Sequence, residues 1–522
     1  MAMTMILSMG MTAFAAETPK GTLTVNNTVA GKTLDLYQIF TATKNGDNVA
    51  YTLNSAYEEF FKTKVENGSS LSGEALSEAA YNYVKGQVGT DGSNGAAFAK
   101  DIMRWILGNT ATVKDTHTTA TTTDTTTVIN NLDYGYYVVY PLGATDTSTA
   151  PGNETVKSVA SLVSVTGNDA TVNMKSNYPT VVKKVNDNKN ADDVNIGDTV
   201  TYTLTSKVPD MTGYDSYVFN FKDTLSAGLT FKEITSVTVG ETTITKVDAG
   251  QEANNTYTLT QDEQNITITM NNFLASNKDK VGQAITVTYT ATLNKDAVTG
   301  FDPNTNKATV EYSNKPGTDN KGESEPSIVD VHTFNFTIFK YYLTGETKTG
   351  LANAEFELYK ANGEVVGDKV NIKKVTDGEY RVATHEEATA EGFKSDVIVS
   401  GNNGKVLVKG LEAGTYYLRE TKAPEGYNKL LSDIKVEIKA NYDPKTGKLT
   451  SYSVDYTYNG TTTTGTEIKD TTTSPEVAVE NKTGAQLPST GSKGALMVTL
   501  AGIVLFGALT ASKAFGKKKA KN

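Results

Sequence analysis

Hydrophobic and polar residues alternate along most of the chain, in short runs bounded by turn residues. Runs such as "DTVTYTLTSKVP" (198–209), "AITVTYTATL" (284–293) and "FNFTIFK" (334–340) place every second side chain on the same face. A period of two is typical of strands with one face against a core. The only convincing helical pattern is "AAFAKDIMRWILG" (96–108), whose apolar residues recur at helical spacing. The pattern therefore predicts a mainly β protein with a short helix in its first part.

Two segments interrupt this alternation and are expected to be irregular. The Thr-rich tract "DTHTTATTTDTTT" (115–127) is typical of a solvated loop. The acidic stretch 316–330 contains proline and glycine and is expected to link two domains.

The chain is long enough for several domains. Its 522 residues exceed what one hydrophobic core organises, since domains hold roughly 100–200 residues. Short strands separated by turn signals favour immunoglobulin-like β-sandwiches, in tandem behind a β-rich first domain with a short helix. The expected segments are 1–16 (signal peptide), 17–176 (N-terminal domain), 177–330 (middle domain), 331–484 (C-terminal domain) and 485–522 (C-terminal address and anchor).

Composition narrows the function classes. The chain has no cysteine, so secreted β domains would need either large cores or a crosslink other than a disulfide. A net charge of -10 argues against nucleic acid as a partner. His117, His332 and His385 have no neighbour at metal-ligand spacing, and we expect them at the surface. We expect no cofactor and no catalytic cluster; whether the first domain binds a metal ion stays open.

The first 16 residues have part of the pattern of an export signal. An apolar stretch ends in Ala13-Phe14-Ala15, which fits the A-x-A pattern before a signal-peptidase cut. The positively charged region that normally precedes such a stretch is missing, and we expect the true start to lie upstream. The sequence thus predicts a secreted protein.

The other end combines a pentapeptide, an apolar run and a basic tail. "LPSTG" (487–491) precedes an apolar run from Gly494 to about Ala511 and then "SKAFGKKKAKN". A run of that length can span a bilayer, with the lysines on the cytoplasmic side. The pattern resembles the cell-wall sorting signal of Gram-positive bacteria, in which a sortase cuts between Thr490 and Gly491. The residues of the motif are Leu487, Pro488, Ser489, Thr490 and Gly491. A simple membrane-anchored ectodomain is the alternative.

Strand parity places three polar residues of the C-terminal domain on apolar faces. In "AGTYYLRETKAPEGYN" (413–428), Glu420 shares a face with Leu418. Lys340 shares a face with Ile338, and in "VAVEN" (477–481) Asn481 falls on the face of the two valines. A buried carboxylate or ammonium is costly unless it is paired or neutral. The simpler alternatives are a salt bridge for Glu420 and a lysine that reaches solvent from its strand end.

Such a trio has a specific chemistry. Burial shifts a lysine toward the neutral, nucleophilic amine and a carboxyl group toward its protonated form. Protonated Glu420 could polarise the Asn481 carbonyl while the Lys340 amine attacks and ammonia leaves. Folding supplies proximity, and well-oriented groups reach effective molarities of ~10^5 M or more. The product would be a Lys340–Asn481 isopeptide bond that ties the first strand of the domain to the last.

The middle domain repeats the pattern with an aspartate. Parity selects Lys183 over Lys184 as the inward lysine, and Asp223 ends an inward stripe in "FNFKDTL" (219–225). Asn306 and Asn314 share one face of the strand "NKATVEYSN" (306–314), so parity leaves both open as partners.

The stretch "YYLRETKAPEGY" (416–427) resembles the E-box of Gram-positive pilins. The C-terminal domain resembles their collagen-adhesin B-type domains, in which the E-box glutamate catalyses a Lys–Asn isopeptide bond. The middle domain resembles the adhesin A-type pilin domain, which implies a triad of Lys183, Asp223 and Asn306, with Asn314 as the alternative. In the first domain "NLDYGYYVVYP" (131–141) has the cadence of an E-box without its glutamate, so we expect no internal bond there.

The resemblance also implies an intersubunit linkage. In "TVNMKSNYP" (171–179), parity puts Lys175 on the outward face at the junction of the first two domains. In backbone pilins a lysine at this junction attacks the acyl-enzyme that a sortase forms on the sorting-signal threonine, here Thr490 of the next subunit. The usual motif is Tyr-Pro-Lys-Asn, whereas "KSNYPT" puts the lysine ahead of the tyrosine. Lys184 is the alternative.

The resemblance implies the major shaft subunit of a sortase-assembled pilus. The expected partners are identical subunits, a pilus-specific class C sortase, a housekeeping sortase and peptidoglycan, with tip or accessory pilins and host surface ligands as further candidates. The expected location is the cell wall and pilus, after a transient membrane-anchored precursor. The alternative is a wall-anchored adhesin or accessory pilin that binds a host ligand. Apart from its own single-turnover crosslinking, the chain is not expected to be an enzyme.

Overall fold

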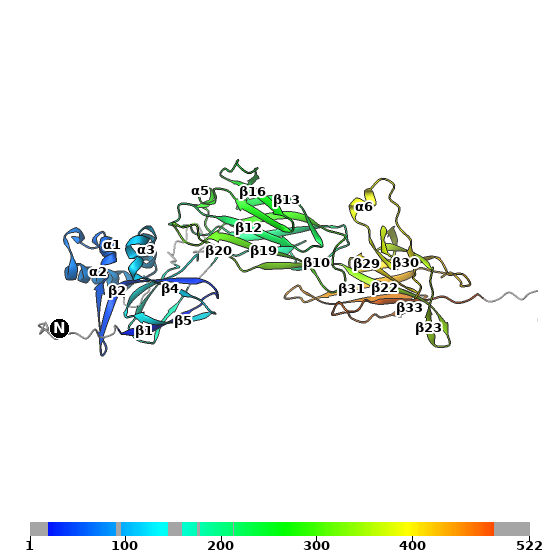
Figure 1. Ribbon diagram of the computed structural model, residues 1–522, viewed down its shortest axis with the longest axis horizontal. Coiled ribbons are helices and arrows are strands. Elements are labelled where there is room, and N and C mark those ends of the chain that lie inside the picture. The colour runs from blue at the N-terminus through cyan, green and yellow to red at the C-terminus, as the bar shows by residue number, and fades with distance from the viewer. Residues whose placement is uncertain (1–18, 90–94, 145–158, 175–177, 212, 485–522) are drawn as a thin grey trace, which may run out of the picture. The chain divides into compact units, whose positions relative to one another are not determined.

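The computed structural model describes residues 19–89, 95–144, 159–174, 178–211 and 213–484 (Figure 1). The chain divides into two compact units. One contains the described residues up to Thr333 together with Tyr442–Thr450, and the other contains Phe334–Asn441 and the described residues from Ser451 on. Strands dominate both units, which confirms the mainly β fold.

The N-terminal part has two sheets and a layer of helices. One sheet has the order β5-β1-β8, and the other has β3-β2-β6-β7 with β4 beside β2. The strands are β1 (Lys20–Asn26), β2 (Thr33–Asn45), β3 (Asn48–Leu53), β4 (His117–Thr121), β5 (Thr126–Asp133), β6 (Gly135–Pro141), β7 (Ser161–Val165) and β8 (Ala170–Asn173). Strand β2 is buried almost continuously because one of its faces meets the other sheet and the opposite face meets the helices.

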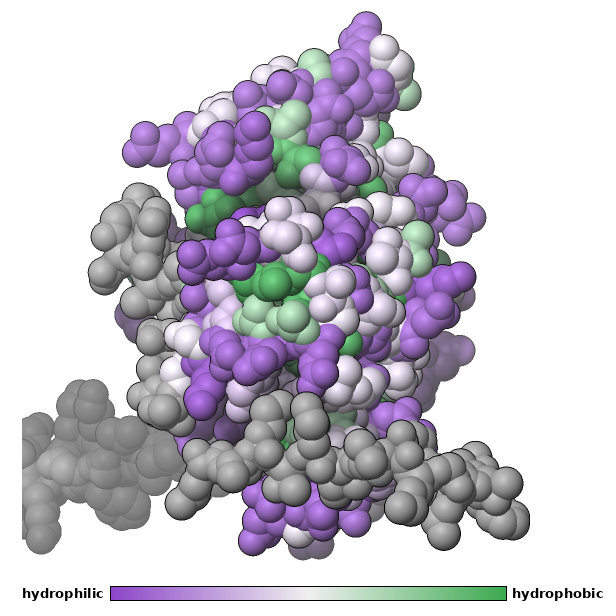
Figure 2. All heavy atoms as spheres, turned by 90° about the vertical axis from the view of Figure 1, so that its left-hand side faces the viewer, coloured by the Kyte–Doolittle hydropathy of each residue, from purple (hydrophilic) through white to green (hydrophobic). Residues whose placement is uncertain are grey.

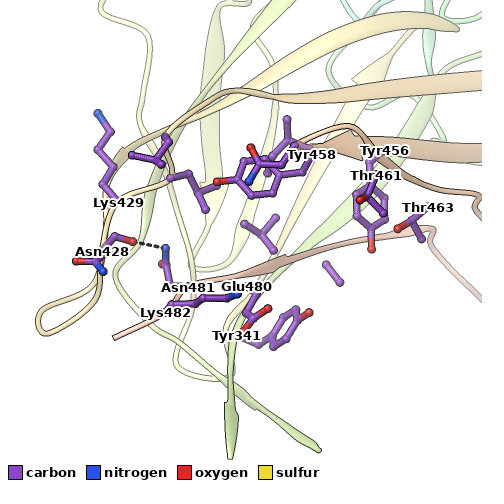
Figure 3. A pocket seen from close by; sticks show the side chains of 16 residues that line it. Tyr341, Asn428, Lys429, Tyr456, Tyr458, Thr461, Thr463, Glu480, Asn481 and Lys482 are labelled. Atoms are coloured by element: carbon purple, nitrogen blue, oxygen red, sulfur yellow. Dashed lines mark hydrogen bonds between the residues drawn. The ribbon is translucent and has the colours of Figure 1, made fainter. Parts of the chain in front are cut away.

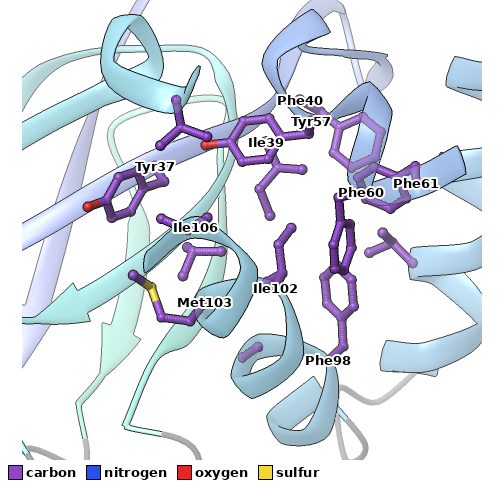
Figure 4. Close-up of a cluster of buried hydrophobic side chains, with 14 of the residues drawn as sticks. Tyr37, Ile39, Phe40, Tyr57, Phe60, Phe61, Phe98, Ile102, Met103 and Ile106 are labelled. Atoms are coloured by element: carbon purple, nitrogen blue, oxygen red, sulfur yellow. The ribbon is translucent and has the colours of Figure 1, made fainter. Parts of the chain in front are cut away.

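The helices cover one face of the β2–β6 sheet. They are η1 (Ser55–Tyr57), α1 (Glu58–Lys62), η2 (Gly68–Ser70), α2 (Gly73–Val88), α3 (Gly95–Gly108), α4 (Thr110–Val113) and η3 (Lys114–Thr116). Figure 4 shows Phe60, Phe61, Phe98 and Ile102 of these helices in one buried cluster with Ile39 of β2. The predicted helix 96–108 is confirmed as α3.

Two sequence expectations are wrong in this region. Helix α2 was missed because its fully buried stripe is thin, including Leu76, Ala80 and Val84, and its other face mixes polar residues with alanines and tyrosines. The Thr-rich tract 115–127 contributes β4 and the start of β5 instead of forming a loop. Threonine is β-branched, which favours strands, and Thr122 and Thr127 are buried there.

The middle domain is a sandwich of two large sheets. One has the order β14-β13-β18-β11-β9, and the other has β10-β21-β19-β12-β17-β16-β15 with β20 beside β19. The strands are β9 (Val182–Val185), β10 (Ala191–Asp193), β11 (Thr199–Lys207), β12 (Phe219–Leu225), β13 (Leu229–Val239), β14 (Thr242–Thr243), β15 (Thr245–Lys246), β16 (Thr256–Asp262), β17 (Asn265–Met270), β18 (Ala284–Leu293), β19 (Asn304–Ser313), β20 (Lys321–Glu323) and β21 (Ser327–His332), with the helix α5 (Phe273–Asn277). The expected linker 316–330 is therefore wrong in part, since β20 and β21 both pair with β19.

The C-terminal domain is also built from two sheets. One has the order β23-β22-β29-β27-β26 with β34 beside β22, and the other has β25-β24-β30-β31-β32-β33 with β28 beside β24. The strands are β22 (Phe334–Thr344), β23 (Thr347–Gly350), β24 (Glu355–Asn362), β25 (Val365–Lys369), β26 (Ile372–Thr376), β27 (Glu379–Val382), β28 (Ile398–Val399), β29 (Lys405–Leu411), β30 (Gly414–Lys422), β31 (Ile434–Tyr442), β32 (Leu449–Tyr458), β33 (Thr461–Thr463) and β34 (Glu476–Glu480), with the helix α6 (His385–Thr389). Strand β34, the last, runs parallel to β22, the first.

The sequence led us to expect all three histidines at the surface, and this expectation is wrong for His332. His332 is only 2% exposed, because the end of β21 is covered by neighbours that include the ring of Tyr442 at 6.1 Å. Burial lowers the pKa of His332 to about 4. His117 is partly buried and pairs with Asp35, whereas His385 is exposed.

Outside the cores the chain is largely polar. The face in Figure 2 is mainly hydrophilic, and its apolar areas are small. Within the described residues, no helix has the length and apolar character needed to cross a bilayer. The predicted apolar span and the predicted signal peptide lie outside the described residues.

Candidate isopeptide-forming sites

The C-terminal domain brings Lys340, Glu420 and Asn481 together. Lys340 lies on β22 opposite Val479 of the parallel strand β34, and Asn481 directly follows that strand. Glu420 reaches the pair from β30 in the facing sheet. The three residues are 0%, 2% and 2% exposed. The inward faces predicted by strand parity are therefore correct for all three residues.

Glu420 lies between the amine and the amide. Its Oε1 is 3.0 Å from Lys340 Nζ, and its Oε2 accepts a hydrogen bond of 3.3 Å from Asn481 Nδ2. Among the described residues, Asn481 Oδ1 has no hydrogen-bond donor, whereas Glu420 Oε1 pairs with the Lys340 ammonium. Both atoms are acceptors while the carboxylate is ionised. A proton on Oε1 would turn that oxygen into a donor that could serve Asn481 Oδ1.

The loop after β30 (residues 423–433), which we call the strap, positions the carboxyl group of Glu420 and the side-chain amide of Asn481. Leu430 N donates to Glu420 Oε2 at 2.7 Å, and the Asn428 carbonyl accepts a hydrogen bond of 2.7 Å from Asn481 Nδ2 (Figure 3). Asn428 N in turn donates to Lys482 O at 2.9 Å. Because Leu430 N can only donate, Oε2 must accept, and the proton of a neutral Glu420 belongs on Oε1. Sequence reasoning missed this strap.

The middle domain brings Lys183, Asp223 and Asn306 together from opposite sheets. Lys183 lies on β9, whereas Asp223 and Asn306 lie on the neighbouring strands β12 and β19 of the other sheet. Their exposures are 1%, 2% and 0%. Lys183 Nζ forms a hydrogen-bonded ion pair with Asp223 Oδ2. The other carboxyl oxygen, Asp223 Oδ1, has no donor among the described residues, and neither has Asn306 Oδ1, as is the case for Asn481 Oδ1 in the C-terminal site.

Two tyrosines that the sequence analysis missed pack beside Lys183, and one of them, Tyr289, also hydrogen-bonds within the site. Lys183 Nζ lies 4.9 Å from the ring centroid of Tyr202 and 5.0 Å from that of Tyr289. The Tyr289 hydroxyl accepts hydrogen bonds from Lys183 Nζ at 2.6 Å and from Asn306 Nδ2 at 2.7 Å. The only sequence signal was the inward parity of Tyr202 and Tyr289 in their strands, which any core tyrosine shares.

Burial brings the pKa values of both lysines closer to neutral pH. It lowers the pKa of Lys183 and of Lys340 to about 8, against the opposing effect of the neighbouring carboxylates. Burial also raises the pKa of Asp223, although Lys183 opposes that shift. Burial therefore favours transfer of a proton from Lys183 to Asp223, because it disfavours the charged form of each group.

The structure separates the alternative candidates. Asn314 lies beyond the end of β19, eight positions and so about 26 Å of strand from Asn306, and is not part of the Lys183 site. Lys184 points away from this site and donates to Asn190 Oδ1 at 2.6 Å. Lys175 and the motif 487–491, including Thr490, lie outside the described residues. Within the described residues, no group of three or more metal-ligating side chains occurs.

Two segments match family models. Residues 339–452 match the SpaA prealbumin-like fold domain, and residues 196–316 match the Gram-positive pilin backbone subunit 2, Cna-B-like domain. The second description is Cna-B-like, where we expected an adhesin A-type domain. These matches confirm the resemblance to Gram-positive backbone pilins that the sequence indicated.

Individual relatives agree with these matches. The chain is 26% identical over 316 residues to the trypsin-resistant surface T6 protein of Streptococcus pyogenes serotype M6, an alignment that covers 54% of this chain. The chain spans about half the length (50%) of that curated relative. Similar solved structures include the T6 backbone pilin of Streptococcus pyogenes (18% identity, TM-score 0.46, covering 90% of this chain and 100% of that chain). Another is the major pilin SpaD of Corynebacterium diphtheriae (18% identity, TM-score 0.40, 89% and 98%).

Proposed function

We propose that this protein is the backbone subunit of a covalently polymerised surface pilus, stiffened by Lys183–Asn306 and Lys340–Asn481 isopeptide bonds. One observation supports this most directly. Each of two tandem pilin-like domains buries a lysine paired with a carboxyl group and places a buried asparagine beside them, bonded to Glu420 in one site and to Tyr289 in the other. Burying an ion pair gives little net stability, so a buried lysine and acid beside an amide suit a reaction better than a structural salt bridge.

The reaction begins with a proton transfer inside the site. In the C-terminal domain Lys340 passes its proton to Glu420 Oε1, 3.0 Å away, and becomes a neutral amine. The new Oε1 hydroxyl polarises the Asn481 carbonyl, and Lys340 Nζ forms a bond to Cγ. The Cγ–Nδ2 bond breaks, one proton moves from Nζ to Nδ2, and ammonia leaves. Folding supplies the proximity that this amide exchange lacks in solution.

The groove beside Asn481 offers a route for the ammonia. It has a volume of about 520 Å³, and its lining includes Asn481, Asn428 and Leu430 (Figure 3). The Asn428 carbonyl already accepts a hydrogen bond from the nitrogen that leaves. It would therefore stabilise that nitrogen as it gains its proton.

The resulting bonds suit a load-bearing shaft. The Lys340–Asn481 bond would join the first strand of its domain to the residue after the last, and the Lys183–Asn306 bond would join β9 to β19 across the two sheets, so that tension along the chain passes through covalent bonds. In a chain without cysteine, these bonds would replace disulfides. The chain acts on itself once and is not an enzyme with turnover.

Assembly would use the two ends of the subunit. A pilus-specific class C sortase would cut between Thr490 and Gly491 and transfer Thr490 to Lys175 of a neighbouring subunit. A housekeeping sortase would attach the finished polymer to peptidoglycan. The product would be a secreted, wall-anchored pilus built from identical subunits.

Intact-mass measurement of the recombinant protein tests the internal bonds. Each Lys–Asn bond releases one ammonia, so we expect a mass deficit of about 34 Da from the two bonds. Tandem mass spectrometry should assign it to peptides that join Lys183 to Asn306 and Lys340 to Asn481. A chain of the full calculated mass would contradict the proposed function.

The pH dependence distinguishes this mechanism from simple amine attack. The reactive pair needs a neutral lysine and a protonated acid, and so holds one proton in total. The pKa of each lysine is about 8, and above this value that proton is lost. Formation of both bonds in freshly synthesised protein should therefore slow as pH rises from 8 to 10. Free amine attack would instead accelerate over this range.

A further inference from the structure

The two sites handle the leaving nitrogen differently. In the C-terminal site one carboxyl group contacts both nitrogens, Lys340 Nζ at 3.0 Å and Asn481 Nδ2 at 3.3 Å. In the middle site Asp223, whose side chain is one methylene shorter, forms its hydrogen bond with Lys183 Nζ. The group that contacts both nitrogens there is the Tyr289 hydroxyl, at 2.6 Å and 2.7 Å.

The chemistry requires a link between these nitrogens. When the Lys183 amine attacks Asn306, Nζ must lose one proton and Nδ2 must gain one before it can leave as ammonia. The acid is needed meanwhile at the Asn306 carbonyl oxygen, where negative charge develops during the attack. Asn306 Oδ1 has no donor among the described residues, and a proton on Asp223 Oδ1 could supply one. A second group that both accepts and donates a proton would remove this conflict.

We propose that Tyr289 is a catalytic residue of the middle domain, whose hydroxyl relays the proton from Lys183 Nζ to Asn306 Nδ2. In the tetrahedral intermediate the hydroxyl gives its own proton to Nδ2 and takes one from Nζ in the same step. The Nζ–Cγ bond then remains, the Cγ–Nδ2 bond breaks, and the tyrosine ends as it began. This inference rests on the proposed function, because it concerns the same crosslinking reaction.

The surroundings suit a relay that is never ionised. A hydroxyl is both a donor and an acceptor, unlike an ammonium or a backbone amide. Burial raises the pKa of Tyr289 well above its ordinary value, so the hydroxyl keeps a proton at all times. Tyr289 also lies directly opposite Tyr202 across the β11–β18 pair, with the two rings stacked at 5.2 Å, which fixes the ring.

The test is Tyr289→Phe, with Tyr202→Phe as its matched control. Both changes remove one buried hydroxyl from a ring beside Lys183, but among the described residues the Tyr289 hydroxyl is the one that hydrogen-bonds to both Lys183 Nζ and Asn306 Nδ2. Full-length protein from a cell-free synthesis pulse would be sampled over time, and the two crosslinked peptides quantified by mass spectrometry. The Lys340–Asn481 bond in the same molecules is an internal control.

We expect Tyr289→Phe to slow the Lys183–Asn306 bond by ~10²-fold or more, the usual contribution of proton transfer by a positioned group. Tyr202→Phe should change its rate by less than about threefold, and the C-terminal bond should form at the parent rate in both variants. The parent should also react more slowly in D₂O than in H₂O. This slowing in D₂O should be larger for the parent than for Tyr289→Phe.

Three outcomes would decide against the relay or its premise. If the parent lacks the middle-domain bond, the proposed function fails. If the parent forms the bond and Tyr289→Phe forms it as fast as Tyr202→Phe, the relay alone is wrong. Neither Lys183→Ala nor the double variant Lys183→Ala/Tyr289→Phe can form the bond. The difference between their melting temperatures therefore measures the structural cost of losing the Tyr289 hydroxyl. A much lower melting temperature of the double variant would assign the slower rate to a loosened core and would overturn the relay.

Discussion

Glu420→Ala is expected to leave the C-terminal domain folded but without its crosslink, and to lower its thermal stability by roughly 10–20 °C. A Lys340–Asn481 bond would close a loop of about 140 residues. By the entropy of loop closure, such a crosslink stabilises by about 5 kcal/mol, and each kcal/mol corresponds to roughly 2–4 °C in a domain of this size. Differential scanning calorimetry would measure the shift, and intact mass would show one ammonia retained.

Two further variants separate the bond from the side chain. Glu425→Ala removes an exposed glutamate of the same motif and should leave both mass and melting unchanged. Lys340→Met removes the nucleophile but keeps an apolar chain at a fully buried position. This variant should also lose the bond and most of the thermal stability that the bond adds. If Glu420→Ala kept the parent's mass deficit, Glu420 would not be the acid of this reaction.

Strand parity located the three residues of the C-terminal site because Lys340 and Glu420 lie on strands with clear turn boundaries and Asn481 directly follows one. Within one strand, alternation fixes the face of every residue, so the buried positions of Lys340, Glu420 and Asn481 followed from their neighbours. Parity says nothing about which strands face or adjoin each other. That information entered through the resemblance to pilin domains, and the structure supplies it directly through the parallel β22–β34 pair.

The same reasoning explains the ambiguity at Asn306 and Asn314. The two residues are eight positions apart in a run that the alternation reads as one strand, so the sequence assigns them the same face, although β19 ends at Ser313. The register of β19 against β12 decides the matter, since Asn306 pairs with Leu225, two positions from Asp223. Register between distant strands cannot be read from the alternation of a single strand.

Other elements were hidden because the residue type carries no signal. The strap acts through the backbone N–H of Leu430 and the backbone carbonyl of Asn428; every residue has such a carbonyl, and every residue except proline has such an N–H. Tyr289 looks like any core aromatic until its hydroxyl is placed between two nitrogens. The sequence can therefore predict the reacting side chains of such a site, while the groups that orient them depend on the fold.

Lys175→Ala is expected to abolish the covalent polymer while leaving the internal crosslinks intact. Burial alternates up to the last described residue of this segment, with Val172 and Met174 buried and Asn173 exposed. Lys175 lies just beyond these residues, outside the part of the chain that the structure describes, and the expectation that it provides the amine for a sortase acyl-enzyme comes from the sequence. Lys184 is half-buried and donates to Asn190 at 2.6 Å, so that amine is already engaged.

The matched set is Lys175→Ala, Lys184→Ala and Thr490→Ala, expressed in cells that carry the pilus sortase. Cell-wall extracts boiled in detergent should show a ladder of high-mass species for the parent and for Lys184→Ala, and monomer alone for the other two variants. All four proteins should keep the mass deficit of the two internal bonds, because neither site includes the altered residues. A ladder lost in Lys184→Ala and kept in Lys175→Ala would move the linkage to the middle domain. In that case the hydrogen bond to Asn190 would have to break before each polymerisation step.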